Sequence, residues 1–220
     1  MDFLNALILL LNYIFVPALA YGSQLAIGAI FVTLIYGILR FANFATGDMM
    51  SFGTMVAILF TWYFQSLGLS LGFLPTALLA IPFAILFMGL YMLIIDKFVF
   101  KYYRLNKSPP VQLAMVSIGV MFVTQAVVRI IIGPSDRRFF DGEKFLIKAN
   151  EFKEMTGLNE GLAIKSTQVI TIVVTIILVS TLFWFLNKTK TGKSMRAYSD
   201  NEDLALLSGI DPKKIVMITW

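Results

Sequence analysis

The sequence predicts an all-α fold, a polytopic transmembrane helix bundle of about six full spans with the start of a seventh and a short cytoplasmic helix. Two observations predict this class. Hydrophobic residues make up 58% of the 220 residues and charged residues only 14%, whereas a soluble domain carries about 25% charged residues. In addition, two long segments, 3–39 and 49–95, contain no charged residue. Such a composition cannot cover a surface with polar groups, so we expect lipid to be the solvent.

The lengths of the two uncharged segments predict the first four spans. A helix crosses a bilayer with about 20 apolar residues, so each segment is long enough for two spans. Pro17 or Gly22 is the expected break in segment 3–39, because both residues disfavour a continuous helix. The stretch 68–75, which reads GLSLGFLP, is the expected break in segment 49–95.

The remaining spans follow from later apolar runs. Residues 109–128 and 166–187 predict the fifth and sixth spans, and a seventh begins at Ile215. A cleaved signal peptide is the alternative for the first run. It requires a basic segment before its apolar core, and no basic residue precedes Arg40. The sequence therefore favours a span that is retained.

The distribution of Lys and Arg predicts the orientation. These residues crowd two connections, 96–107 and 188–214, which we therefore expect on the cytoplasmic side. The loop 134–165 between them carries equal numbers of basic and acidic residues and is expected to be periplasmic. Counting back over six spans puts the N-terminus in the cytoplasm and Arg40 near the cytoplasmic face. The whole chain, 1–220, is expected to form a single transmembrane domain.

The composition excludes several chemistries. Cysteine and histidine are absent, so the chain has neither a thiolate nor an imidazole for catalysis or for a zinc or haem site. We therefore predict no catalytic residue, no cofactor and no metal. The net charge of +5 does not indicate nucleic-acid binding, because the basic residues lie between apolar runs and not on one stripe.

An interrupted segment lies between two apolar helices. Residues 36–53 read YGILRFANFATGDMMSFG, and they place Arg40, Asn43, Thr46 and Asp48 among glycines. Broken helices at membrane depth are tolerated where they line a wet cavity, and their ends form polar sites. The segment is therefore a candidate for a translocation pathway. The alternative is a cytoplasmic turn in which Asp48 is only the N-cap of the next helix.

A capped helix is predicted in the cytoplasmic segment 188–214. Ser199 or Asp200 is the expected N-cap, with acidic residues in the first turn and Gly209 at the C′ position. The pair Asp211-Pro212 then starts another helix. Leu204, Leu207 and Ile210 give the capped helix an apolar face. Such a helix is suited to docking in a groove of another protein; the alternative is a helix lying on the lipid surface.

No nucleotide site is predicted. Gly192-Lys193-Ser194 matches the end of a phosphate-binding loop, but Asn187 stands where that motif needs its first glycine, and an apolar helix precedes it instead of a strand. The chain is therefore not expected to be an enzyme. If ATP drives a transport step, the ATPase must be another polypeptide.

Two motifs resemble one family. TGKSMRAYSDNEDLALLSGIDPKK is similar to the cytoplasmic coupling segment of the LivH-type permeases, the membrane subunits of branched-chain amino acid ABC transporters. IYGILRFANFATGDMMSFG is similar to a second element of that family. The chain departs from the family at Thr46, where His is common. It also ends at Trp220, before further spans, so it resembles a permease truncated at its C-terminus.

The resemblance implies a permease of the bacterial inner membrane that works by alternating access. Its implied partners are a second, related permease subunit, two cytoplasmic ATP-binding subunits, a periplasmic binding protein and the membrane lipid. The implied substrate is a branched-chain amino acid, or another amino acid, an amide or urea. An ATP-independent secondary transporter or channel is the alternative, and a membrane-embedded enzyme is the weakest one.

The resemblance also implies roles for individual residues. The residues implied at the ATPase contact are Met195, Arg196, Ala197, Asp200, Ala205, Gly209 and Ile210. The residues implied along the substrate pathway are Asn43, Phe44, Ala45, Gly47 and Asp48. The loop 134–165 is the implied contact for the binding protein.

Overall fold

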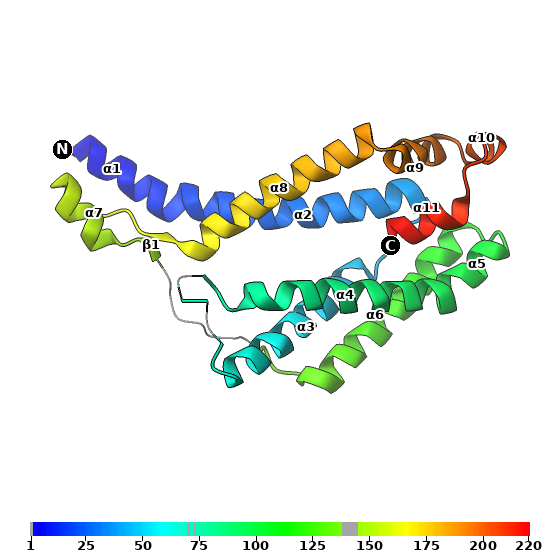
Figure 1. Cartoon of the computed structure of the whole chain (residues 1–220), viewed down its shortest axis with the longest axis horizontal. Coiled ribbons are helices and arrows are strands. Elements are labelled where there is room, and N and C mark those ends of the chain that lie inside the picture. The colour runs from blue at the N-terminus through cyan, green and yellow to red at the C-terminus, as the bar shows by residue number, and fades with distance from the viewer. Residues whose placement is uncertain (1, 70, 73, 138–144) are drawn as a thin grey trace. The chain divides into compact units, whose positions relative to one another are not determined.

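The computed structural model describes residues 2–69, 71–72, 74–137 and 145–220, and most of these are helical (Figure 1). They form two compact units. One comprises Met1–Ile30, Leu71–Pro75 and Asp141–Phe183, and the other comprises Phe31–Ser70, Thr76–Phe140 and Trp184–Trp220. Among the described residues, four helices are long and apolar enough to cross a membrane: Phe3–Leu39, Ala77–Leu105, Pro110–Ile132 and Ser166–Lys188. The predicted class, an all-α polytopic membrane bundle, is confirmed.

The first uncharged run forms one continuous helix, so the predicted division at Pro17 or Gly22 is wrong. Helix α1 (Asp2–Leu10) passes through the π-helical turn η1 (Leu11–Phe15) directly into α2 (Val16–Leu39). In a regular helix the ring of Pro17 would clash with the carbonyl four residues earlier. The wider turn η1, in which the N–H of Val16 bonds to the carbonyl of Leu11, lies just before the proline and accommodates it.

The second uncharged run divides where the sequence predicted. Helix α3 (Thr46–Ser66) packs against α4 (Ala77–Ile95) and against α6 (Pro110–Ile132). The connection between α3 and α4 includes Gly68 and Gly72, both with positive φ angles of 72° and 61°. Glycine adopts this conformation at little cost. The expected break at 68–75 is confirmed among its described residues.

Helix α4 extends beyond its apolar part. It continues through a second π-helical turn, η2 (Asp96–Phe100), into the short helix α5 (Lys101–Leu105). Helix α6 then begins with Pro110 in its first turn, a position where the missing N–H is harmless. The first charges after residue 48 thus appear at Asp96, at the end of the apolar part of α4.

The predicted periplasmic loop contains short elements of its own. Strand β1 (Phe145–Ile147) pairs antiparallel with β2 (Ile164–Lys165), and helix α7 (Ala149–Thr156) lies between them in sequence. The side chain of Asn12 bonds to this loop, donating to the Gly161 carbonyl and accepting from the Ala163 N–H, at 3.4 and 3.3 Å. Residues 138–144 of the loop, with their expected charges, lie outside the described residues.

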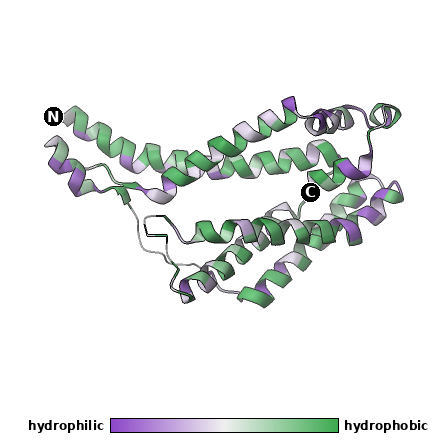
Figure 2. Cartoon of the chain, viewed as in Figure 1, coloured by the Kyte–Doolittle hydropathy of each residue, from purple (hydrophilic) through white to green (hydrophobic). Residues whose placement is uncertain are grey.

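Four helices complete the chain. They are α8 (Ser166–Lys188), α9 (Lys190–Asp200), α10 (Glu202–Leu207) and α11 (Pro212–Thr219). Figure 2 shows hydrophobic residues along the long helices and hydrophilic residues gathered on α5, α7 and α9. The division agrees with long helices in lipid and short polar elements outside it.

The core of the second unit joins the interrupted segment to the short helices α9 and α11. Phe41 is fully buried, and its ring lies 5.3 Å from that of Phe100, which in turn stacks on Trp220 at 5.2 Å. Met195 of α9 and Ile215 of α11 belong to the same buried cluster. The elements named by the two sequence motifs are therefore packed together.

Candidate functional site

The interrupted segment is a compact turn held by its own polar groups. The Oδ1 of Asn43 accepts the N–H of Ala45 at 3.1 Å, and the carbonyl of Asn43 accepts the hydroxyl of Thr46 at 2.7 Å. Asparagine stabilises turns in this way because its short side chain mimics a backbone carbonyl. Ala45 is completely buried. Asn43 and Ala45 thus shape the segment from within.

Helix α6 anchors the segment from outside. The N–H of Phe44 donates to the Oγ of Ser117 at 3.0 Å, and Ser117 itself is fully buried. An unpaired N–H in this apolar surrounding would be costly, so Ser117 satisfies a group that the break in the helix leaves free. The Phe44 side chain is 57% exposed.

Asp48 is not the N-cap of α3, so the alternative in which Asp48 serves only as an N-cap is wrong. Ala45 occupies the cap position, without a side-chain hydrogen bond, and Asp48 lies in the first helical turn. A carboxylate there still faces the positive end of the helix dipole. Asp48 is half-buried, whereas Gly47 beside it is exposed.

The exposed face of α3 is polar in its N-terminal half. Gly47, Ser51 and Thr54 are exposed and recur at helical spacing, and Asp48 borders them. The hydroxyls of Ser51 and Thr54 donate to the carbonyls four residues earlier, at 3.2 and 3.0 Å. By contrast, α4 exposes large apolar side chains such as Ile85 and Leu86. The two hydroxyls are satisfied within the helix, but the carboxylate of Asp48 beside them would be costly in lipid and is typical of a wet surface.

The segment 188–214, predicted to be cytoplasmic, is a chain of capped helices. Thr189 caps α9 by accepting the N–H of Gly192 at 3.0 Å, and Asp211 caps α11 by accepting the N–H of Lys213 at 2.9 Å. The N-cap of α10 is Asn201, whose Oδ1 accepts the N–H of Leu204 at 3.0 Å. The predicted cap at Ser199 or Asp200 is wrong, because both residues form the last turn of α9.

The end of α10 agrees with the sequence. Gly209 has a φ of 79°, and its N–H bonds to the carbonyl of Leu206 at 3.0 Å, while the N–H of Ile210 bonds to that of Ala205 at 3.0 Å. These paired bonds are those of a Schellman motif. The predicted C′ position of Gly209 and the start of α11 at Pro212 are confirmed.

The residues expected at the ATPase contact divide into two groups. Met195 and Ala205 are 2% and 3% exposed, and Ile210 packs partly buried against the core. The exposed members are Arg196, Ala197, Asp200 and Gly209. Exposed leucines accompany them on α10, where Leu204 is 60% and Leu207 is 85% exposed. The first group holds the segment to the core, and only the second is accessible.

Arg40 joins the interrupted segment to the end of α9. Its guanidinium donates to the main-chain oxygens of Ser199 and, at 3.3 Å, of Asp200. The Oγ of Ser199 donates to the carbonyl of Gly37 at 2.6 Å. Arg40 has a φ of 59°, which is uncommon for a residue with a side chain. The backbone therefore bends sharply at the end of α2, where the Arg40 side chain contacts α9.

Arg40, Ser199 and Ser117 were not among the predicted site residues. One signal was present for Arg40, which is the only basic residue before Lys97. A lone cation between apolar runs indicates a specific partner. Ser199 and Ser117 carried no such signal, because a serine in a helix is ordinary and its partners lie 162 and 73 positions away.

Tyr198 and Glu202 form a hydrogen bond between α9 and α10, beside this core. The phenol of Tyr198 donates to Oε1 of Glu202 at 2.8 Å. Partial burial raises the pKa of the Tyr198 phenol, and the hydrogen bond to the Glu202 carboxylate and its negative charge raise it further. The phenol therefore remains a donor throughout the physiological range.

Comparison with known proteins identifies the family. Residues 14–220 match the model of the family described as branched-chain amino acid transport system / permease component. The chain is 25% identical over 203 residues to the high-affinity branched-chain amino acid transport system permease protein LivH of Escherichia coli K12 and to that of Salmonella typhimurium. Both alignments cover 90% of this chain and 62% of the relative.

A further relative shows the same relationship. The permease protein BraD of Pseudomonas aeruginosa is 24% identical over 207 residues, which cover 93% of this chain and 64% of BraD. The chain thus spans less than two thirds of the length of these relatives. No solved structure matches the chain.

Proposed function

Because the chain belongs to the family of branched-chain amino acid transport permeases, we propose that it is the membrane subunit of an ABC importer. Its substrate would be a branched-chain or related amino acid, which crosses the inner membrane by alternating access. The proposed partners are a second, related permease subunit, two cytoplasmic ATPases and a periplasmic binding protein. The observation that carries the proposal is the contact of Arg40 with the end of α9, which joins the two family motifs.

The pathway is proposed to follow the polar face of α3. That face comprises Gly47, Asp48, Ser51 and Thr54, and it begins at the turn formed by Asn43, Phe44 and Ala45. If a partner subunit supplies the other wall of a wet passage, the polar face of this chain lies in water and not in lipid. Gly47 and Asp48 face the passage in this arrangement, whereas Asn43 and Ala45 maintain its shape.

The ATPase is proposed to dock on the accessible side of α9 and α10. Leu204 and Leu207 supply the apolar contact, and Arg196, Ala197, Asp200 and Gly209 surround it. Movement of this segment would be transmitted through Met195 and Ile210, which pack in and against the core, and through Arg40 to the turn before α3. Each of these links is a packed contact or a hydrogen bond within one compact unit.

The N-terminus is proposed to lie on the periplasmic side, in place of the cytoplasmic side that six spans would require. With the continuous helix Phe3–Leu39 counted as one crossing, and with α3 counted as a crossing beside the four candidate spans, five helices precede the coupling segment, an odd number. The contact of Asn12 with Gly161 and Ala163 supports this orientation, since that loop is the proposed periplasmic one. Lys and Arg remain concentrated on the opposite side.

Site-specific crosslinking tests the proposal. The chain contains no cysteine, so a single Leu207→Cys variant carries the only thiol. We expect this variant, purified from membranes with its partners, to crosslink to an ATPase subunit with a yield that changes when ATP is added. Ala205→Cys is the matched control, because residue 205 lies two positions away on the buried side of α10. A Leu207→Cys protein that co-purifies with no ATPase would refute the importer function.

Asp48→Asn tests the pathway separately. If Asp48 faces the passage, the variant should reduce uptake at least tenfold while the subunits still assemble. Ser66→Ala, at the far end of α3, is the control and should leave uptake unchanged. Loss of assembly with normal uptake per assembled complex would show that Asp48 is structural.

A further inference from the structure

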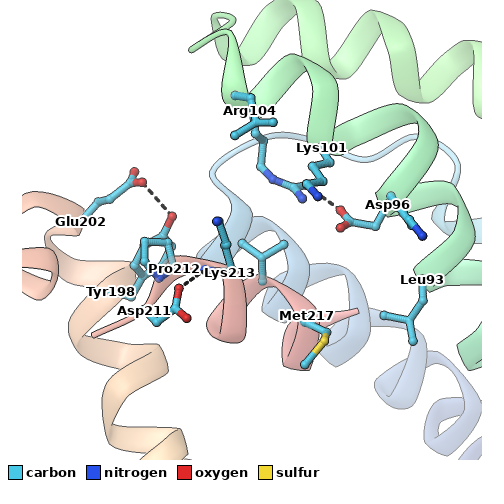
Figure 3. A pocket seen from close by; sticks show the side chains of 13 residues that line it. Leu93, Asp96, Lys101, Arg104, Tyr198, Glu202, Asp211, Pro212, Lys213 and Met217 are labelled. Atoms are coloured by element: carbon cyan, nitrogen blue, oxygen red, sulfur yellow. Dashed lines mark hydrogen bonds and ion pairs between the residues drawn. The ribbon is translucent and has the colours of Figure 1, made fainter. Parts of the chain in front are cut away.

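A cavity of about 550 Å³ opens between the polar extension of α4 and the cytoplasmic helices (Figure 3). Its lining comes from three parts of the second unit: the η2 and α5 extension, the adjoining ends of α9 and α10, and α11. Neither the pathway nor the docking face proposed above uses this cavity. Its size is in the range of sites that hold small molecules and lipid headgroups.

The cavity is polar at one end and apolar at the other. Figure 3 shows Lys101 and Arg104 at one end, while Leu93 and Met217 lie at the other. The same gradient runs along both helices that form the walls. Leu93 precedes the charged turn η2, and Lys213 precedes the aliphatic residues of α11. The cavity therefore crosses the boundary between the apolar and polar parts of the bundle.

Some of the cations that line the cavity are not paired with a carboxylate. Four cations and three carboxylates line the cavity. Asp96 is paired with Arg104 at 2.7 Å, Glu202 accepts the phenol of Tyr198, and Asp211 caps α11. Within the part of the chain that the structure describes, Lys97, Lys101 and Lys213 have no carboxylate partner. The lining carries one net positive charge, which one singly charged anion would neutralise.

We propose that this cavity binds an anionic phospholipid of the phosphatidylglycerol class, with its phosphodiester at Lys97, Lys101 and Lys213 and an acyl chain along Leu93, Val216 and Met217. The proposal rests on the orientation proposed above, in which this end of α4 meets the cytoplasmic leaflet. Basic pockets at that depth attract anionic headgroups. The phosphodiester carries the single negative charge that the lining lacks, and the apolar end matches the acyl chain.

The apolar end distinguishes a lipid from a free phosphate. A soluble anion would contact only the three lysines, which are exposed and which water and salt screen effectively. The acyl chain adds contact with the exposed side chains of Leu93 and Met217, beside the core residue Val216. A protein side chain as the occupant is less favoured by the lining, because the cavity opens at the level of the membrane interface.

Lipid binding to the purified chain tests the proposal. Native mass spectrometry in detergent would compare phosphatidylglycerol with phosphatidylcholine of the same acyl chains. We expect at least tenfold tighter binding of phosphatidylglycerol. The triple variant Lys97→Gln, Lys101→Gln, Lys213→Gln should weaken this binding about fivefold for each lysine, as expected for basic side chains near an anionic headgroup. The triple variant Lys188→Gln, Lys190→Gln, Lys193→Gln removes equal charge outside the cavity and should keep the preference.

Two further measurements test the proposal if the first triple variant does not fold. Met217→Trp keeps every charge and fills the apolar end, so it should also reduce phosphatidylglycerol binding. Inorganic phosphate at equal concentration should not displace the lipid. Equal binding of the two lipids, an unchanged preference in the first triple variant, or displacement by phosphate would each overturn the proposal. No ATPase is needed for these measurements, so their outcome is independent of the crosslinking test.

Discussion

The guanidinium of Arg40 lies against the C-terminus of α9, where it donates to the main-chain oxygen of Ser199. The two residues are 159 positions apart. One stands at the break between α2 and α3, and the other in the coupling segment. A cation at a helix C-terminus satisfies carbonyls that have no partner within the helix. This contact is therefore a direct link from α9 to the proposed pathway.

Replacing Arg40 should weaken that link. Arg40→Asn keeps a residue that tolerates positive φ but removes the guanidinium. Because Arg40 is exposed, we expect the free energy of unfolding to fall by only about 1 kcal/mol, with a larger effect on ATP-driven uptake. Uptake and thermal unfolding of the same preparation measure the two effects. Arg40→Lys keeps the charge near the helix end and should retain part of the uptake; equal uptake in all three proteins would contradict the link.

Gly209 should be essential for the end of α10. Its φ of 79° costs a residue with a Cβ about 1–2 kcal/mol, and more when the side chain is branched. Gly209→Val is expected to disturb the coupling segment, so that ATP hydrolysis by the assembled complex continues while uptake falls. Gly209→Asn is the control, since asparagine adopts this conformation more readily. Tight coupling in the valine variant would show that the cap is dispensable.

Gly192 should be essential for the corner between α8 and α9. A Cβ at this position would lie 2.6 Å from the Cα of Leu186 and would overlap the carbonyl oxygen of Phe185. Since these are backbone atoms, they cannot move aside cheaply, and Gly192→Ala should lower the free energy of unfolding by about 2–3 kcal/mol. Thermal unfolding in detergent measures this loss. Gly119→Ala, where the Cβ meets nothing within 4 Å, should cause no loss.

The hydrogen bond between Tyr198 and Glu202 should make stability fall at alkaline pH. An unfolded tyrosine titrates near pH 10, and the pKa of Tyr198 in the folded protein is raised. The stabilisation is therefore complete below about pH 10 and is lost as the pH rises through the folded pKa. Melting temperatures between about pH 8 and 11 should decline more steeply for the native chain than for Tyr198→Phe. Parallel curves would argue that the phenol contributes nothing.

Local rules account for the features that the sequence predicted correctly. A helix in lipid needs only a long enough apolar run, which identified the apolar segments. A cap or a break depends on residues within about four positions, which identified the ends at Gly209 and Pro212 and the break after α3. The two family motifs located the interrupted and coupling segments for the same reason, because each is continuous in sequence. The class of fold and the family therefore followed from the sequence.

The tertiary structure decided which side of each motif is accessible. Met195 and Ala205 belong to the coupling motif, yet both are buried, and Met195 lies in one cluster with residues of α2, α3, α4, α6 and α11. The π-helical turn before Pro17 allows the first apolar run to form one continuous helix, although its length was sufficient for two spans. The pairing of Arg40 with Ser199 and the cavity beside Lys101 arise only when distant segments meet. Periodicity along one helix specifies a face, but the neighbour that covers the face is determined by packing in three dimensions.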